Sequence, residues 1–206
     1  MTTKAPKAPK APKALKRRHI LPLIALAALS ALSAAGVQAQ APLTPATPAA
    51  PPPEVAAELD GARLQGSGTL RFIGLRVYDA RLWAGAAVAG ADWATAPLAL
   101  EFEYARSLDG VRIAERSLTE MRRQGDIDAD VAERWLGAMK QLFPDVKAGD
   151  RITGINVPGM GARFFINGRL KGDVRDLNFA RHFFGIWLSP KTSEPALRDS
   201  LLGKVS

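Results

Sequence analysis

The spacing of hydrophobic residues changes twice along this chain, and this change limits the possible fold more than any other feature. The segment Leu98–Tyr104 places Leu, Phe and Tyr on one face and Glu on the other, which is typical of an antiparallel strand with one dry face. Apolar residues then recur every three or four positions, which predicts a helix capped by Ser107 or Asp109 and ended by Gly125. The same spacing predicts a second, more regular helix over Ala129–Leu142.

Strand-like patterns flank these helices on both sides. Alternating or β-branched residues bounded by turn residues predict five further strands, over 62–72, 74–83, 150–157, 161–166 and 169–174. Asn167-Gly168 predicts a type I′ turn between the last two strands. A short aromatic helix is expected over 179–188, opened by Asn178, with a last helical turn or two over 197–202. This order predicts an α+β fold in which helices lie on an antiparallel sheet.

The first 39 residues have the pattern of a secretory signal peptide. Seven basic residues and no acidic one precede an apolar run over 20–36, and a small-residue cleavage site follows, with cleavage expected after Ala39. The alternative is an uncleaved membrane anchor, for which the run is short. Residues 40–53 are rich in Pro and Ala and are expected to form an extended linker. We therefore expect one folded domain over 54–206, in a protein of the periplasm or the extracellular medium.

The positive net charge of the chain comes from this leader. The sequence holds 28 Lys and Arg residues against 20 Asp and Glu residues, and removal of residues 1–39 leaves 21 basic residues against the same 20 acidic ones. The mature chain therefore gives no electrostatic reason to expect a nucleic-acid partner. After cleavage no segment is apolar and long enough to span a membrane. The chain has no cysteine, which excludes disulfides and cysteine catalysis.

Few side chains remain for catalysis. His182 is the one histidine after residue 39, and no Gly-x-Ser-x-Gly motif supplies a serine nucleophile for it. The sequence shows no cluster of His, Cys or carboxylate residues with zinc-binding spacing. We therefore expect neither a metal nor another cofactor, and the pattern names no catalytic residue.

Arginine and tyrosine are the remaining candidates for a ligand site. Arginine binds a carboxylate through two parallel hydrogen bonds, and a tyrosine hydroxyl can donate another. The same pair can polarise a carbonyl or phenolate oxygen, as an isomerase requires. We expect the ligand-binding residues to be Arg71, Tyr78, Tyr104 and Arg116. The alternative is that these arginines, together with Arg112, form surface ion pairs with nearby glutamates.

A set of motifs in the expected domain resembles the chalcone isomerase-like proteins, and in particular their exported bacterial branch. In chain order the motifs are Gly66-Ser67-Gly68, Arg71, residues 74–83 (GLRVYDARLW), residues 167–172 (NGRLKG), Phe179-Ala180 and Ile186-Trp187-Leu188. Together they cover almost the whole expected domain. The resemblance implies an open-faced β-sandwich, in which a large antiparallel sheet is covered by a helical layer and the ligand cleft lies between the two.

The same resemblance implies two kinds of function. Plant members of the family are isomerases that cyclise chalcones to flavanones, whereas other members bind fatty acids without catalysis, through arginine and tyrosine. Arg71 corresponds to the family arginine, and Tyr78 stands where the isomerases carry threonine and the fatty-acid binders tyrosine. The helix positions that supply tyrosine and asparagine in the isomerases fall near Asp109 and Arg116, which match neither.

We therefore expect a non-catalytic binder of a small apolar carboxylate such as a fatty acid. Two alternatives stay open. One is an isomerase, an intramolecular lyase acting on a chalcone-like enone or another phenolic compound. The other is a periplasmic accessory protein whose cleft is filled by its own side chains.

Overall fold

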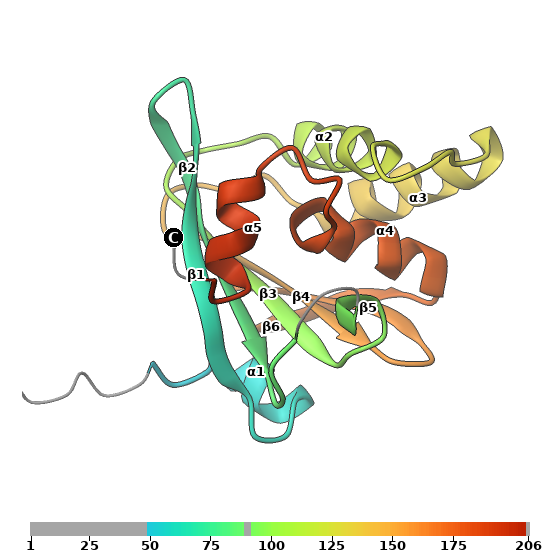
Figure 1. The fold of residues 1–206 in the computed structure, drawn as a ribbon. Coiled ribbons are helices and arrows are strands. Elements are labelled where there is room, and N and C mark those ends of the chain that lie inside the picture. Colours follow the sequence, from blue (N-terminus) through green and yellow to red (C-terminus); the bar gives the residue numbers. More distant parts are fainter. Residues whose placement is uncertain (1–48, 89–91, 205–206) are drawn as a thin grey trace, which may run out of the picture. The chain divides into compact units, whose positions relative to one another are not determined.

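The computed structural model describes residues 49–88 and 92–204 of the chain (Figure 1). The predicted signal peptide and most of the predicted linker lie outside the described residues. In chain order the elements are α1 (Pro53–Glu58), β1 (Arg63–Phe72), β2 (Leu75–Ala84), a 3₁₀ helix (Asp92–Ala94), β3 (Leu98–Tyr104), α2 (Gly110–Arg122), α3 (Ala129–Leu142), β4 (Arg151–Val157), β5 (Gly161–Ile166), β6 (Arg169–Val174), α4 (Leu177–Leu188) and α5 (Pro195–Leu201). In this part of the chain every helix is too short or too polar to cross a bilayer.

The six strands form one antiparallel sheet in the order β1–β2–β3–β4–β5–β6. Each strand pairs with the next one in sequence, and the longest connection, between β3 and β4, carries α2 and α3. β1 and β6 are the outer strands, and α5 packs along β1, where Gly66 lets the backbone of Ser200 approach closely. The predicted α+β fold, with helices layered on an antiparallel sheet, is confirmed.

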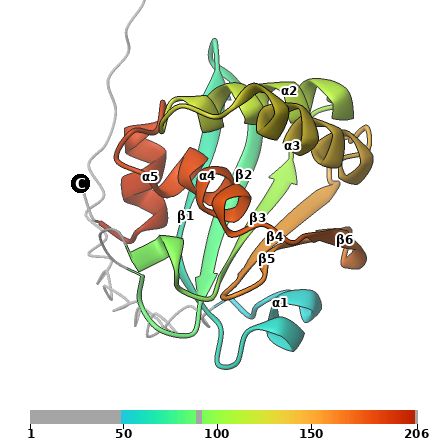
Figure 2. The same ribbon diagram turned by 90° about the vertical axis from the view of Figure 1, so that its right-hand side faces the viewer.

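Alternation along the strands gives the sheet two different faces. Helices α2 to α5 cover one face, which we call the helix-covered face (Figures 1 and 2). Leu82 of β2 points to this face, whereas Trp83 packs on the opposite, outer face against Val55 of α1. Aromatic rings pack between the helical layer and the sheet. The ring centroids of Phe164 in β5 and Phe183 in α4 are 5.0 Å apart, and both side chains are buried. Burying such a side chain stabilises the fold by about 1.5–3 kcal/mol.

The outer face is more covered than the sequence indicated. Helix α1 was not predicted; it begins at Pro53, the last residue of the predicted linker, where proline suits the first helical position. The alternation of β3 indicated one dry face, yet Glu101 on the other face is buried as well. Its carboxylate accepts a hydrogen bond from Trp83 Nε1 at 2.8 Å, which compensates part of the cost of burying the charge.

Side-chain caps fix the starts of two helices. Asp109 caps α2 as predicted, because its carboxylate accepts a hydrogen bond from the Arg112 amide at 2.9 Å. The prediction that Asn178 opens α4 is wrong. Asp176 is the cap, and its carboxylate accepts hydrogen bonds from the amides of Asn178 and Phe179. Asp and Asn favour this position almost equally, so the sequence alone did not distinguish them.

Two tight turns of the sheet share one backbone conformation. Asn167 and Gly168, between β5 and β6, have φ angles of 50° and 79°, in agreement with the predicted type I′ turn. Ile73 and Gly74, between β1 and β2, have φ angles of 49° and 75°. Asparagine adopts a positive φ readily, whereas a β-branched isoleucine is strained there. The β1–β2 turn therefore carries a residue that the backbone does not favour.

Candidate functional site

A pocket of about 380 Å³ lies between the helix-covered face of the sheet and helices α2 and α4. Most of its wall is apolar, with side chains that include Leu70, Phe102, Ile113, Ile152, Phe183 and Trp187. A volume of this size is typical of small-molecule sites. A second hollow of about 440 Å³ is lined by five residues of α2, α3 and the loop between them, and it lies at the surface away from the tyrosines.

The structure brings all four predicted ligand-binding residues to the first pocket. Tyr78 and Tyr104 occupy paired positions on β2 and β3, and their ring centroids are 5.8 Å apart. Arg71 lies at the exposed end of β1, and Arg116 projects from α2 with a largely exposed side chain. The phenols therefore lie in the pocket and the two guanidinium groups at its mouth. Their part in binding stays a prediction.

Arg71 reaches the pocket because strand β1 is irregular. Leu70 pairs with Tyr78, but Arg71 pairs with Arg76, so the register shifts between these two neighbouring residues. In a regular strand neighbours point to opposite faces, whereas Leu70 and Arg71 both line the pocket. A second shift lies between Leu64 and Gly66, beside the Gly66-Ser67-Gly68 motif, and glycine inside a strand often marks such a bulge.

The two tyrosine hydroxyls differ in their hydrogen bonds. Tyr78 Oη accepts a hydrogen bond from Trp187 Nε1 at 2.8 Å, whereas Tyr104 Oη has no hydrogen-bond partner among residues 49–88 and 92–204. Burial raises the pKa of both phenols well above the usual range, and the bond from Trp187 opposes this only partly for Tyr78. Both tyrosines are therefore neutral hydrogen-bond donors at ordinary pH.

An alkaline titration tests this burial directly, because Tyr78 and Tyr104 are the only tyrosines of the chain. Their raised pKa values contribute stability that is complete below about pH 10, the ordinary pKa of tyrosine, and is lost as the pH rises through the folded values. We expect phenolate absorbance to appear only together with loss of the circular dichroism of the fold. The chain in denaturant is the control and should titrate near pH 10. Phenolate absorbance that rises while the dichroism is intact would contradict the burial.

The arginines around the pocket mouth differ in their charge partners. Arg116 pairs with Glu120 at 2.7 Å, so the alternative of a surface ion pair holds for this residue. Arg71, Arg106 and Arg112, which we call the rim arginines, also line the pocket. None of the three has an acidic side chain within ion-pair distance in the described part of the chain. Asp109, Glu120 and Glu194 also line the pocket, so the rim arginines lie near acidic residues but form no ion pair with them in the described part of the chain.

Arg112 and Trp187 are two of the lining residues that were not predicted as part of the site. Arg112 was interpreted as a surface residue, although it lies four positions before Arg116 and so on the same side of α2, which was a usable signal. Trp187 was expected only as part of the short aromatic helix and of a motif shared with the family. No pattern in the sequence indicates its hydrogen bond to Tyr78, because the two residues are 109 positions apart.

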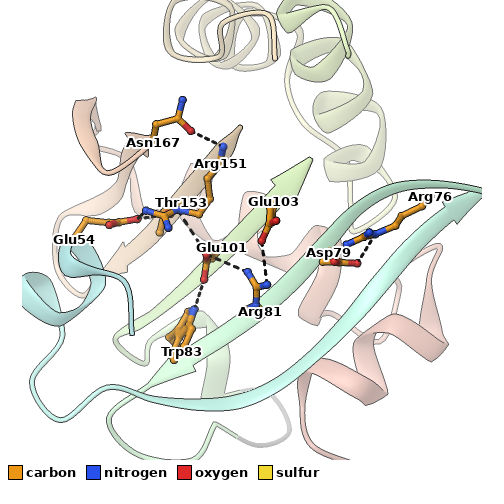
Figure 3. Close-up of polar contacts among 10 residues, drawn as sticks. All are labelled: Glu54, Arg76, Asp79, Arg81, Trp83, Glu101, Glu103, Arg151, Thr153 and Asn167. Atoms are coloured by element: carbon orange, nitrogen blue, oxygen red, sulfur yellow. Dashed lines mark hydrogen bonds and ion pairs between the residues drawn. The ribbon is translucent and has the colours of Figure 1, made fainter. Parts of the chain in front are cut away.

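A second group of charges lies on the outer face of the sheet (Figure 3). Arg81 contacts Glu101 at 3.2 Å and Glu103 at 3.1 Å, and Arg151 donates to Glu54 of α1 at 2.8 Å. These charges are paired with one another, so the group fastens α1 to the sheet and leaves little for a ligand. No cluster of His, Cys, Asp or Glu suited to a metal ion occurs within the described residues.

Comparisons with known proteins identify a family and a fold for this chain. A family model described as chalcone isomerase-like matches residues 50–203. An uncharacterized protein of Haemophilus influenzae is 32% identical over 108 residues, which span 52% of this chain and 52% of that relative, about half the length of each. The crystal structure of the fatty-acid binding protein AtFAP1 of Arabidopsis thaliana aligns with a TM-score of 0.55 and 16% identity, over 70% of this chain and 88% of that chain. At this identity the structural likeness shows the fold.

Proposed function

This chain belongs to the chalcone isomerase-like family, and from that premise we propose that it is an exported, non-catalytic protein that binds a small apolar carboxylate, such as a fatty acid. The pocket between the sheet and helices α2 and α4 is the proposed site. The apolar tail occupies its depth, and the carboxylate lies at its mouth.

One observation carries the proposal: an apolar pocket ends in arginines that lack acidic partners among the described residues. Apolar walls favour a hydrocarbon tail because its transfer from water contributes about 0.8 kcal/mol per buried methylene. A guanidinium matches a carboxylate with two parallel hydrogen bonds. The rim arginines supply three such groups at the mouth, so a molecule with one acidic end and one apolar end satisfies both parts of the pocket.

The tyrosines support a ligand with an acceptor group. Tyr104 Oη has no hydrogen-bond partner within the described residues, and the oxygen of Tyr78 is already an acceptor from Trp187. Each hydroxyl therefore has a proton to donate. Because their pKa values are raised, they do not become the anionic bases that proton abstraction needs near neutral pH. The two tyrosines are therefore suited to donate hydrogen bonds to a bound ligand, and not to act as catalytic bases.

The solved relative and the helix residues also favour binding over isomerisation. AtFAP1 is described as a fatty-acid binding protein. The carboxylate of Asp109 is engaged in capping α2, and Arg116 is paired with Glu120. The resemblance places the tyrosine and asparagine of the isomerases near these two positions. The open volume of the pocket also argues against a cleft that is filled by the protein's own side chains.

The test is a pair of ligands that differ only in the acidic group. Oleic acid and oleyl alcohol are titrated into the chain that begins at Gln40. In a second experiment, native mass spectrometry of protein purified from periplasm measures the mass of the chain and of any co-purifying lipid. We expect oleic acid to bind at least tenfold more tightly than oleyl alcohol, and the periplasmic protein to begin at Gln40. Equal binding of both ligands, or binding of neither, contradicts the proposed ligand class. A mass that retains residues 1–39 contradicts export by cleavage.

A further inference from the structure

The β1–β2 turn, Phe72–Leu75, exposes three large apolar side chains in four consecutive residues. The exposed fractions are 63% for Phe72, 86% for Ile73 and 56% for Leu75. In both ribbon views the end of this hairpin projects past the helices that cover the sheet (Figures 1 and 2). Side chains exposed to this extent contribute little to the core, and a contiguous apolar patch of this kind typically marks an interaction site.

The backbone conformation of the β1–β2 turn also points to an interaction site. Ile73 has the positive φ that Asn167 has in the β5–β6 turn, and the following glycines also match. The chain thus contains an unstrained version of this turn. A β-branched residue at such a φ is strained, and here it is almost fully exposed. Folding gains nothing from isoleucine at position 73, so its apolar side chain is explained by contact with something outside the chain.

The charges beside the turn indicate what that partner is. Between Leu70 and Val77 the charged residues are Arg71 and Arg76, with no acid among them, although Arg76 is paired with Asp79 of the same strand. The rim arginines lie at the same end of the molecule, because Arg71 and Phe72 line the pocket together with Arg106 and Arg112. Four arginines line this pocket against three acids, Asp109, Glu120 and Glu194. Apolar side chains flanked by arginines, at an end of the molecule with this small excess of positive charge, fit the interface of a bilayer that contains anionic lipid.

We propose that the β1–β2 turn inserts Phe72, Ile73 and Leu75 into the interface of an anionic phospholipid bilayer. Because Phe72 also lines the pocket, this contact sets the pocket mouth against the lipid. The pocket then exchanges its ligand with the membrane without passage through water. The exchange step rests on the proposed function, whereas the membrane contact does not.

The substitution Ile73→Asn separates membrane binding from folding. It places at this turn the residue that the β5–β6 turn already carries, so stability should be retained or increased. The matched control is Leu170→Asn, which removes another exposed leucine, 61% exposed, from strand β6. Sedimentation with vesicles of phosphatidylcholine, with and without phosphatidylglycerol, measures binding at low and high salt.

We expect the unsubstituted chain and Leu170→Asn to bind the anionic vesicles, more weakly at high salt. Ile73→Asn should bind them roughly tenfold more weakly or worse, with a thermal midpoint at least as high. Equal vesicle binding of Ile73→Asn and the unsubstituted chain overturns the proposal. A concentration-dependent dimer that Ile73→Asn abolishes also overturns it, because the turn would then bind a second copy.

Oleic acid binding in solution distinguishes this proposal from the proposed function. A chain that binds oleic acid but no vesicles contradicts the membrane contact alone. A chain that binds vesicles through Ile73 but no oleic acid contradicts the fatty-acid ligand alone and supports the membrane contact.

Discussion

The chain that begins at Gln40, with the substitutions Arg71→Ala and Arg112→Ala, is expected to bind oleic acid about 30- to 100-fold more weakly than the same chain without them. Both arginines lie at the pocket mouth without an acidic partner among the described residues. At a partly exposed site, each guanidinium–carboxylate contact contributes about 1–1.5 kcal/mol, and a factor of ten in Kd corresponds to about 1.4 kcal/mol. Isothermal titration or displacement of a fluorescent fatty acid measures the change.

The matched control for this pair is Arg134→Ala with Arg181→Ala. These arginines lie on helices α3 and α4 with exposed side chains, outside the pocket lining. The control removes the same net charge, so its Kd should change by less than about threefold through long-range electrostatics alone. Oleyl alcohol should bind both double variants and the unsubstituted chain equally. Equal losses of oleic acid affinity in the two pairs would show that net charge, and not the rim arginines, attracts the ligand.

Gly110→Ala is expected to destabilise the fold by about 3 kcal/mol and to disturb the pocket. Gly110 is the first residue of α2, and its amide donates to Asp145 Oδ1 at 2.9 Å. A Cβ atom at this position would lie 2.2 Å from the carbonyl oxygen of Phe143 and 2.6 Å from the carbonyl carbon of Pro144. Backbone atoms cannot rotate away, so α2 must shift from the segment that follows α3, as in an overpacked core. Denaturant unfolding measures the loss, and oleic acid affinity should fall with it because α2 carries Arg112 and Ile113.

The control for this substitution is Gly137→Ala, a glycine-to-alanine change in the neighbouring helix α3. A Cβ atom there meets nothing within 4 Å, and the position is exposed within the helix. Alanine is favoured over glycine in a helix interior by about 1 kcal/mol, so this variant should be more stable by about that amount. If Gly110→Ala were as stable as the unsubstituted chain, the close contact between α2 and the segment after α3 would be wrong.

Much of the fold could be predicted because its elements carry strong local patterns. Helix α3 has the predicted bounds, since its apolar residues recur regularly at helical spacing. Asn167-Gly168 identified the β5–β6 turn, because few other residue pairs adopt a positive φ twice in succession. Helix α1 was missed because it is short and follows a proline-rich stretch. Its stability comes from burying Val55 against the outer face of the sheet, which a local pattern does not reveal.

The pocket could be predicted only in part. Tyr104 stands on the apolar face of its strand, so alternation indicated that it points to the helix-covered face. Neither face of the strand that carries Tyr78 is purely apolar, so the position of Tyr78 follows only from its pairing with Tyr104. Arg71 was assigned to the site on resemblance, and it lines the pocket, whereas simple alternation from Leu70 would have placed it on the outer face. The register shift between Leu70 and Arg71 brings Arg71 to the pocket, and a local pattern does not reveal it because register depends on the paired strand. Arg112 was missed because its lack of an acidic partner follows from tertiary packing.

Strand β6 has a consequence for how these molecules behave at high concentration. Among the residues that the structure describes it pairs with β5 on one side only, so its other side presents amide and carbonyl groups that a strand of another molecule can pair with. The strand is six residues long, its pairing is interrupted by a bulge at Phe164/Phe165, and its exposed side chains include Arg169 and Lys171. A second strand docking there would have to follow the bulge and bring these cations close to its own. The sheet is thereby protected against growing from one molecule into the next, and the protein can accumulate without aggregating through this edge.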